Sequence, residues 1–196
     1  MTDPITFALA VLALLATPGP TNTLLATSGA AAGFKRSLPL IAAEMLGYMI
    51  SITLLALVIG PFVRASHELS IALRILCALF LFYSAWKLWQ EGAAAITSDH
   101  PVSFRRVLMA TGLNPKGIVF AFVIVPYLSH GQVAPALPYM GALLGFIAVV
   151  GSAWIAGGAA LRAGASATIG SGFARRAGAL VLCVFATIIT GSTFTA

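Results

Sequence analysis

The sequence predicts an all-α polytopic membrane protein with about six transmembrane helices in two inverted three-helix repeats. Three observations lead to this fold class: the composition, the series of apolar runs, and a proline break that opens each half of the chain. The 196 residues are 60% hydrophobic and 8% charged, with a mean hydropathy of +1.01. Since a soluble domain carries roughly 25% charged residues, this composition is typical of a chain embedded in a bilayer.

The apolar runs define the spans and the repeats. A span needs about 20 apolar residues, so the length allows about six or seven spans with short loops and no separate soluble domain. The predicted spans are residues 4–28, 38–59, 69–89, 107–128, 136–161 and 177–194. They form one transmembrane domain over 1–196, with a first repeat at 4–90, a loop at 91–106 and a second repeat at 107–195. Three spans in each half make the repeats inverted.

The basic residues predict the orientation. They gather in alternate loops and at their edges: Lys35, Arg36, Lys87, Arg105, Arg106, Lys116, Arg162, Arg175 and Arg176. The other side has Arg64, with Arg74 one turn into the third span. By the positive-inside rule, the first, third and fifth loops are cytoplasmic and both termini lie outside. The net charge of +6 therefore orients the chain in the lipid bilayer and does not indicate a nucleic-acid partner.

The first break lies at Pro18, Gly19 and Pro20, inside an otherwise continuous apolar run. The prolines lack the N–H groups that would bond to the carbonyls of Leu14 and Ala16. In hydrocarbon such a break is tolerated where it is buried in protein or lines a wet cavity. A second reading is a helix kinked only for packing.

Polar residues follow the first break directly. Thr21, Asn22 and Thr23 occupy the first turn of the second half-helix. A helix N-terminus presents free N–H groups and a partial positive charge, so it is a natural seat for a carboxylate at membrane depth. The pattern therefore suggests a binding site at residues 18–22.

The second break, at Asn114, Pro115 and Lys116, repeats this pattern in the fourth span. Pro115 frees the carbonyl of Thr111 and disfavours helix at Asn114. A lysine in the first turn of a half-helix opposes the helix dipole unless an anion lies between them. The alternative is that Lys116 extends to the cytoplasmic interface.

Glu44 is the acidic residue placed well inside a span. Intramembrane acids are rare and point to function, here uptake of a proton, binding of an ammonium group, or pairing with Lys116. Tyr48 lies one turn further on the same helix face. The alternative places Glu44, about two turns from Lys35, near the cytoplasmic headgroups.

Other chemistry finds little support. His67, His100 and His130 fall in loops without metal-ligand spacing, and no Walker or G-x-S-x-G sequence occurs, so we expect no metal, no cofactor and no enzymatic activity. Cys77 and Cys183 stand alone in apolar runs and read as small buried hydrophobes. A membrane thiol-redox protein using both cysteines is the enzymatic alternative.

Several motifs together resemble the lysine exporter (LysE/RhtB) family of amino-acid efflux proteins. They are Thr17-Pro18-Gly19-Pro20 with Asn22-Thr23-Leu24-Leu25, then Gly33-Phe34-Lys35-Arg36-Ser37, Tyr83-Ser84-Ala85-Trp86-Lys87-Leu88, and Asn114-Pro115-Lys116. They cover nearly the whole chain in the family's order. The resemblance implies six helices with an inverted repeat in the bacterial cytoplasmic membrane, and proton-driven export of small amino acids or their derivatives.

Two positions depart from the family pattern. Thr21 separates Pro20 from Asn22, and Tyr48 stands after Gly47 where many members have an acid. Either Glu44 replaces that acid, or the chain is similar to the subgroup with an aromatic residue there. Export of another small solute or a metal ion, and a membrane assembly subunit, are the remaining alternatives. Whether the chain forms a homo-oligomer stays open.

Overall fold

The computed structural model describes residues 4–90, 102–162 and 171–194, and all elements assigned within these ranges are helical. In chain order they are α1 (Pro4–Ala16), α2 (Pro20–Ala32), α3 (Phe34–Ser37), α4 (Pro39–Val58), α5 (Gly60–Ala65), α6 (His67–Gln90), α7 (Phe104–Gly112), α8 (Lys116–Val119), a π-helical turn η1 (Phe120–Ile124), α9 (Pro126–Ser129), α10 (Val133–Arg162) and α11 (Ser171–Phe194). The predicted loop at 91–106 lies outside the described residues as far as residue 101.

The long helices confirm the all-α polytopic fold. Three segments are each long and apolar enough to cross a membrane, namely Phe34–Val58, His67–Lys87 and Val133–Leu161. Two helix pairs reach that length only together: α1 with α2, bent by 63°, and α7 with Lys116–Ile124, bent by 55°. With α11, which is apolar over Ala179–Gly191, each of the six predicted spans corresponds to one of these segments.

The bends fall where the prolines predicted them. The first lies between Ala16 and Pro20, and the second lies between Gly112 and Lys116. Within the second half the chain turns again at Pro126, where the Val125 N–H bonds to the Phe120 carbonyl at 2.8 Å and closes a π-helical turn. Each repeat thus begins with a bent helix, as expected, while the inverted relation between the repeats stays a prediction.

Some predicted loops are helical. The segment after the first span forms α3, which begins behind Gly33 at φ 85°, a left-handed conformation that suits glycine. The segment before the third span forms α5. The fifth loop was predicted to extend to Arg176, but α11 already begins at Ser171. In each case the element is too short or too polar for apolar periodicity to reveal it.

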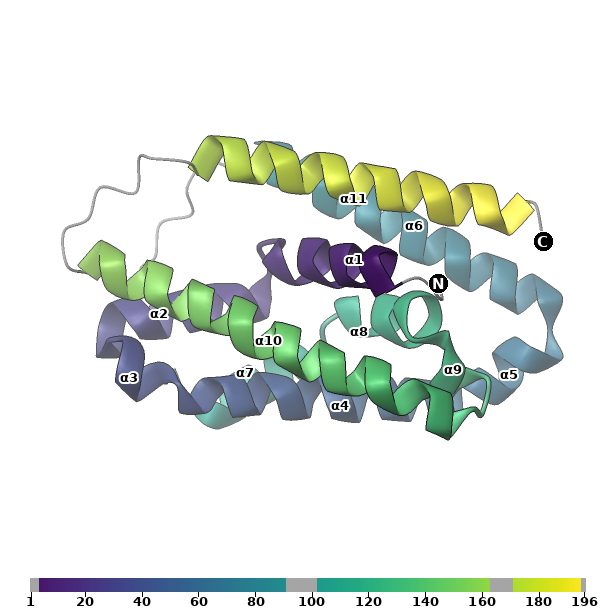
Figure 1. Ribbon diagram of the computed structural model, residues 1–196, viewed down its shortest axis with the longest axis horizontal. Coiled ribbons are helices and arrows are strands. Elements are labelled where there is room, and N and C mark those ends of the chain that lie inside the picture. The colour runs from purple at the N-terminus through teal and green to yellow at the C-terminus, as the bar shows by residue number, and fades with distance from the viewer. Residues whose placement is uncertain (1–3, 91–101, 163–170, 195–196) are drawn as a thin grey trace.

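Three helix pairs pack side by side: α6 with α11, α2 with α10, and α4 with α7. Figure 1 shows α6 and α11 together along one edge, α4 along the opposite edge, and α1 between them. Small residues permit the closest approaches. A Cβ on Gly158 would collide with the Ala26 carbonyl oxygen, and one on Gly29 would collide with that of Ile155. These glycines let the backbones of α2 and α10 touch, as in many membrane helix pairs.

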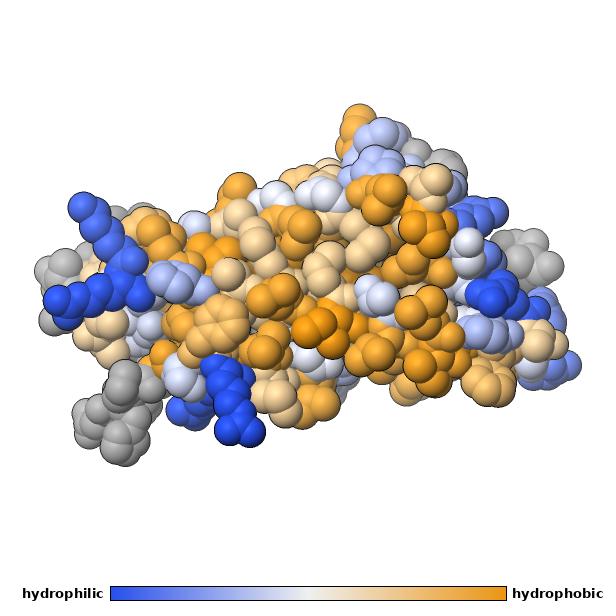
Figure 2. All heavy atoms as spheres, turned by 90° about the horizontal axis from the view of Figure 1, so that it is seen from below, coloured by the Kyte–Doolittle hydropathy of each residue, from blue (hydrophilic) through white to orange (hydrophobic). Residues whose placement is uncertain are grey.

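The surface matches a bilayer environment. Figure 2 shows a broad apolar belt across the middle of one face, with hydrophilic side chains gathered toward its two ends. In Figure 1 the end of the molecule that carries α3 also carries the C-terminal end of α10 and the start of α11, and α5 and α9 lie at the opposite end. The described ends of successive long helices thus alternate between the two ends of the molecule, as the span order requires.

Candidate functional site

The first break is held together by Asn22. Gly19 is extended there, and the side-chain Nδ2 of Asn22 donates to the carbonyls of Leu15 at 2.6 Å and Thr17 at 2.8 Å. The amide thereby replaces backbone donors that the break removes from the helical ladder. The carbonyls that receive it lie one residue beyond Leu14 and Ala16, the pair expected from the proline positions alone.

The second break is held by Asn114 in a different way. Its Oδ1 accepts from the backbone N–H of Lys116 at 3.1 Å, a local bond that fixes the turn before α8. Its backbone N–H donates to the Thr111 carbonyl at 3.0 Å. The sequence predicted that Pro115 leaves this carbonyl free, and that expectation is wrong, because the chain turns tightly enough for the next N–H to reach it.

The two breaks are joined through hydroxyl groups. Thr21 Oγ1 lies 3.1 Å from Thr111 Oγ1, and Asn114 Nδ2 donates to Thr21 Oγ1 at 3.4 Å. All three side chains are buried. Sequence reasoning named Thr111 only for its carbonyl and missed its hydroxyl, which becomes informative only once α7 is known to lie against α2.

Lys116 completes the link between the breaks. Its Nζ donates to the Thr17 carbonyl at 2.6 Å, and the side chain lies against Gly19, where a Cβ would be 3.5 Å from Nζ. Only 3% of Lys116 is exposed. Of the two placements that the sequence left open, the structure therefore has the inward one, and Lys116 does not extend to the interface.

Glu44 is also buried, with 1% of the residue exposed, so it does not lie among the headgroups. Its Oε2 has no hydrogen-bond partner in the described structure and faces Gly151 of α10, where a Cβ would come within 2.9 Å. Lys116 is close enough for the two charges to interact electrostatically, although no hydrogen bond joins them. Oε2 is thus an acceptor without a hydrogen-bond donor between α4 and α10.

Tyr48 lies one turn beyond Glu44, as predicted, and is 1% exposed. Its ring packs edge-on against Phe120 of η1, with the centroids 5.3 Å apart. It therefore contributes to the packing between α4 and the second broken helix.

A cavity of about 130 Å³ lies at the breaks. It is lined by Thr17, Pro18, Gly19, Pro20, Phe80, Tyr83, Ser84, Lys87, Asn114, Pro115 and Lys116. Six of the predicted site residues therefore meet in one cavity. Thr21, Asn22, Tyr48 and Glu44 are not among its lining residues. Pro20 is exposed, so the cavity is open to the surroundings.

The α6 wall of this cavity was missed by sequence reasoning. Phe80, Tyr83, Ser84 and Lys87 follow helical spacing and so occupy one face of α6. In the sequence alone, Tyr83 and Lys87 with Trp86 and Trp89 form an aromatic and basic cluster at the end of a span, which is typical of an interface anchor. The helical spacing of these residues was the available signal. An interface anchor and a cavity wall at the end of a helix, however, show the same spacing.

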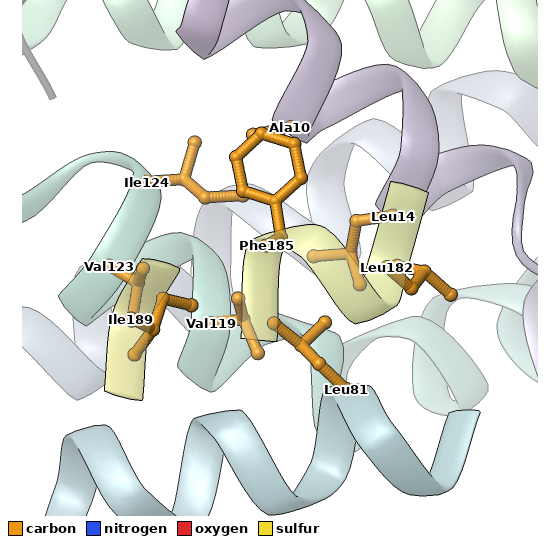
Figure 3. A pocket seen from close by; sticks show the side chains of 9 residues that line it. All are labelled: Ala10, Leu14, Leu81, Val119, Val123, Ile124, Leu182, Phe185 and Ile189. Carbon is orange, nitrogen blue, oxygen red and sulfur yellow. The ribbon is translucent and has the colours of Figure 1, made fainter. Parts of the chain in front are cut away.

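A second, apolar cavity of about 10 Å³ lies where α1, α6, α11 and the second broken helix meet (Figure 3). Its nine lining residues are all apolar: Ala10, Leu14, Leu81, Val119, Val123, Ile124, Leu182, Phe185 and Ile189. This space is about the size that a single water would need, so the helices are closely packed here.

Bent helix pairs, a cavity with polar side chains between them and a buried acid are features of a membrane protein built on broken helices. The chain belongs to the LysE type translocator family, whose sequence pattern matches residues 12–191. An uncharacterized membrane protein of Pseudomonas aeruginosa is 27% identical over 202 residues, which cover 88% of this chain and 92% of that protein. No solved structure matches the chain. Members of this family are transporters and not enzymes, so the chain is a membrane exporter of small solutes.

Proposed function

We propose that the protein exports amino acids or small amino-acid derivatives across the bacterial cytoplasmic membrane, driven by the proton gradient. The observation that carries this proposal is the joining of both helix breaks around one polar cavity, with the buried carboxyl group of Glu44 in the same protein interior. Broken helices at corresponding positions of two repeats are where secondary transporters bind their substrates.

The cavity offers groups suited to a carboxylate. Lys116 and Asn114 line it with an ammonium and an amide group, and Gly19 and Pro20 place the N-terminus of α2 at its wall. α2 has 13 residues and no side-chain cap, so the positive end of its dipole favours an anion. The cargo carboxylate would bind here.

The Thr17 carbonyl is the natural acceptor for the cargo's ammonium group. In the described state the ammonium of Lys116 occupies it at 2.6 Å. Cargo would therefore displace Lys116 from Thr17 and provide, in its carboxylate, a new partner for the lysine.

Glu44 is suited to couple transport to protons. A buried carboxylate without a hydrogen-bond donor is costly at membrane depth, and a proton removes that cost by neutralising it. The ammonium group of Lys116 lies near this carboxyl group. Export driven by an inward proton gradient requires that cargo and proton bind in alternation. An ionised Glu44 would attract the cargo's ammonium group, and a proton taken up from outside would remove that attraction and favour release.

The topology suits export. We place Lys35, Arg36, Lys87, Arg105 and Arg106, all exposed, on the cytoplasmic side, with both termini outside. The α6 wall of the cavity runs to Lys87 in the last turn of that helix. The cavity would therefore be reached from the cytoplasm in this state, as an exporter requires.

A panel of toxic amino acids and analogues, applied to cells that overproduce the protein, tests the proposal. We expect protection against at least one compound, and faster efflux of that compound that stops when a protonophore collapses the gradient. Glu44→Gln and Asn114→Ala should each lower this efflux at least about tenfold, whereas Glu68→Gln, at an exposed acid near the start of α6, should not. Normal efflux in both site variants would overturn the mechanism, and no protection by any compound would overturn the cargo class.

A further inference from the structure

The polar cavity has an uneven charge. Two of its described lining residues are lysines, Lys87 from α6 and Lys116 from α8, and none is acidic. Glu44, the nearest intramembrane acid, is not part of the lining. The described lining therefore adds positive and no negative charge around a solute, and low-dielectric walls strengthen the effect of such charges.

Lys87 is well placed to act on an entering solute. It lies in the last turn of α6, one turn from Ser84 on the same face, and it is exposed whereas Lys116 is buried. The negative end of the α6 dipole stabilises a cation at this position. Lys87 thus stands at the accessible edge of the cavity, and Lys116 stands at its inner wall.

This arrangement restricts the cargo. A carboxylate is attracted by both lysines, whereas a cationic side chain is repelled by them. In the described structure the Thr17 carbonyl accepts a hydrogen bond from an ammonium group, that of Lys116. This acceptor suffices for a single ammonium group. The volume of about 130 Å³ is below the roughly 300 Å³ at which pockets for drug-sized ligands begin, so the cargo is small.

We propose that Lys87 is a charge-selecting residue of this cavity, and that the cargo is a small carboxylate-bearing solute without a cationic side chain. The statement about the cargo rests on the proposed function. The statement that Lys87 selects by charge does not depend on transport. It assigns Lys87 a role in specificity that its place among aromatic residues at the end of a span did not suggest.

Cysteine labelling tests the charge of the cavity without reference to transport. Ser84→Cys places a thiol in the cavity wall, and the purified protein is treated with an anionic or a cationic methanethiosulfonate reagent. The chain with only its two native cysteines gives the background rate, and a free thiol gives the intrinsic ratio of the two reagents. We expect the anionic reagent to be favoured by about threefold or more over that ratio at low salt, and less at high salt.

Charge removal at two positions of α6 makes the test specific. Lys87→Gln should lower the anionic preference by about threefold, while Arg74→Gln should leave it unchanged because it removes a charge about 20 Å away along the same helix. Tyr83→Cys in the same wall repeats the measurement if Ser84→Cys folds poorly. An absent preference, a preference that Lys87→Gln leaves intact, or failure of both thiols to react would each overturn the proposal.

Transport by proteoliposomes then tests the cargo class. L-asparagine, L-aspartate and L-2,4-diaminobutyrate share a four-carbon chain and differ in side-chain charge. We expect the cationic compound to move at least about tenfold more slowly than the better of the other two, and Lys87→Glu to narrow that gap. Preferential transport of diaminobutyrate would overturn the inference. An anionic labelling preference without transport of any amino acid would support Lys87 as charge-selecting and count against amino-acid export.

Discussion

Lys116 Nζ donates a 2.6 Å hydrogen bond to the carbonyl of Thr17, a residue 99 positions earlier in the chain. This bond connects the start of the second half-helix in one repeat to the broken backbone of the other. Both residues are buried, at 3% exposure each. A lysine placed this way is at once a structural link between the repeats and a positive group that interacts with Glu44.

The first prediction follows from that double role. Lys116→Met approximately keeps the length of the side chain. It leaves the Asn22 amide as the remaining side-chain donor to the Thr17 carbonyl, and it removes the cation that interacts with Glu44. Removing one member of a buried charge pair costs about 3 kcal/mol or more. We expect a marked drop in the unfolding temperature of the detergent-purified protein and loss of efflux.

A double variant tests the electrostatic part of this prediction. Adding Glu44→Gln to Lys116→Met removes the isolated acid and should recover part of the lost stability, although efflux stays absent. If the two losses of stability simply add, the residues do not interact as described.

The second prediction contrasts the two asparagines. Asn22 uses its NH₂ group to donate to two carbonyls, whereas Asn114 uses its Oδ1 to accept from the Lys116 N–H and its Nδ2 for a longer, 3.4 Å bond to the Thr21 hydroxyl. Aspartate matches asparagine in shape but, when ionised, can only accept, and a hydroxyl can turn to donate to it. Asn22→Asp therefore places an anion against two carbonyl oxygens and should destabilise the protein by about 2 kcal/mol or more, while Asn114→Asp keeps its bond from the Lys116 N–H and should destabilise the protein much less.

Thermal unfolding of the two purified variants against the parent checks this contrast. The same chemical change is made at corresponding positions of the two breaks, so each variant is the control for the other. Equal unfolding temperatures in both would show that the asparagines do not hold the breaks in the way described.

The breaks themselves were predictable because their cause is local. Pro18, Pro20 and Pro115 remove backbone donors whatever surrounds them, so the bends lie where the sequence placed them. The intramembrane position of Glu44 was likewise readable from the apolar run around it. Such features depend on residues that are close together in the chain, and these can be read directly from a sequence.

The composition of the cavity was not predictable in the same way. Lys116 has a flexible side chain that can reach either the interface or the interior, and only its contact with Thr17 decides between them. The face of α6 with Ser84 and Lys87 became a cavity wall only because α6 packs beside the breaks. Both facts depend on how distant helices pack, for which one sequence carries no direct signal.

The third prediction concerns the space that Gly151 leaves for Glu44. A Cβ there would lie 2.9 Å from Oε2, so Gly151→Ala pushes the carboxyl group out of its position between α4 and α10. We expect efflux to fall by about tenfold while the fold is retained, since the Glu44 side chain can move to relieve the contact. Gly145→Ala, on the same helix with open space at its Cβ, is the matched control and should transport normally. Equal efflux from the two variants would show that the position of Glu44 is not critical.

The last prediction concerns the contact between α2 and α10, which fixes one half of the first broken helix. Gly158 and Gly157 are neighbours on α10, but a Cβ at Gly158 would collide with the backbone oxygen of Ala26, and one at Gly157 meets nothing within 4 Å. Backbone cannot move aside as a side chain can, so Gly158→Ala must separate the helices and should cost about 1–3 kcal/mol, whereas Gly157→Ala should be neutral or slightly stabilising in the helix. Unfolding temperatures of both purified variants measure the difference.

Gly158→Ala should also lower efflux, because α2 carries Asn22 and the N-terminus that faces the cavity. A stable, fully active Gly158→Ala variant would show that α2 and α10 do not touch as described.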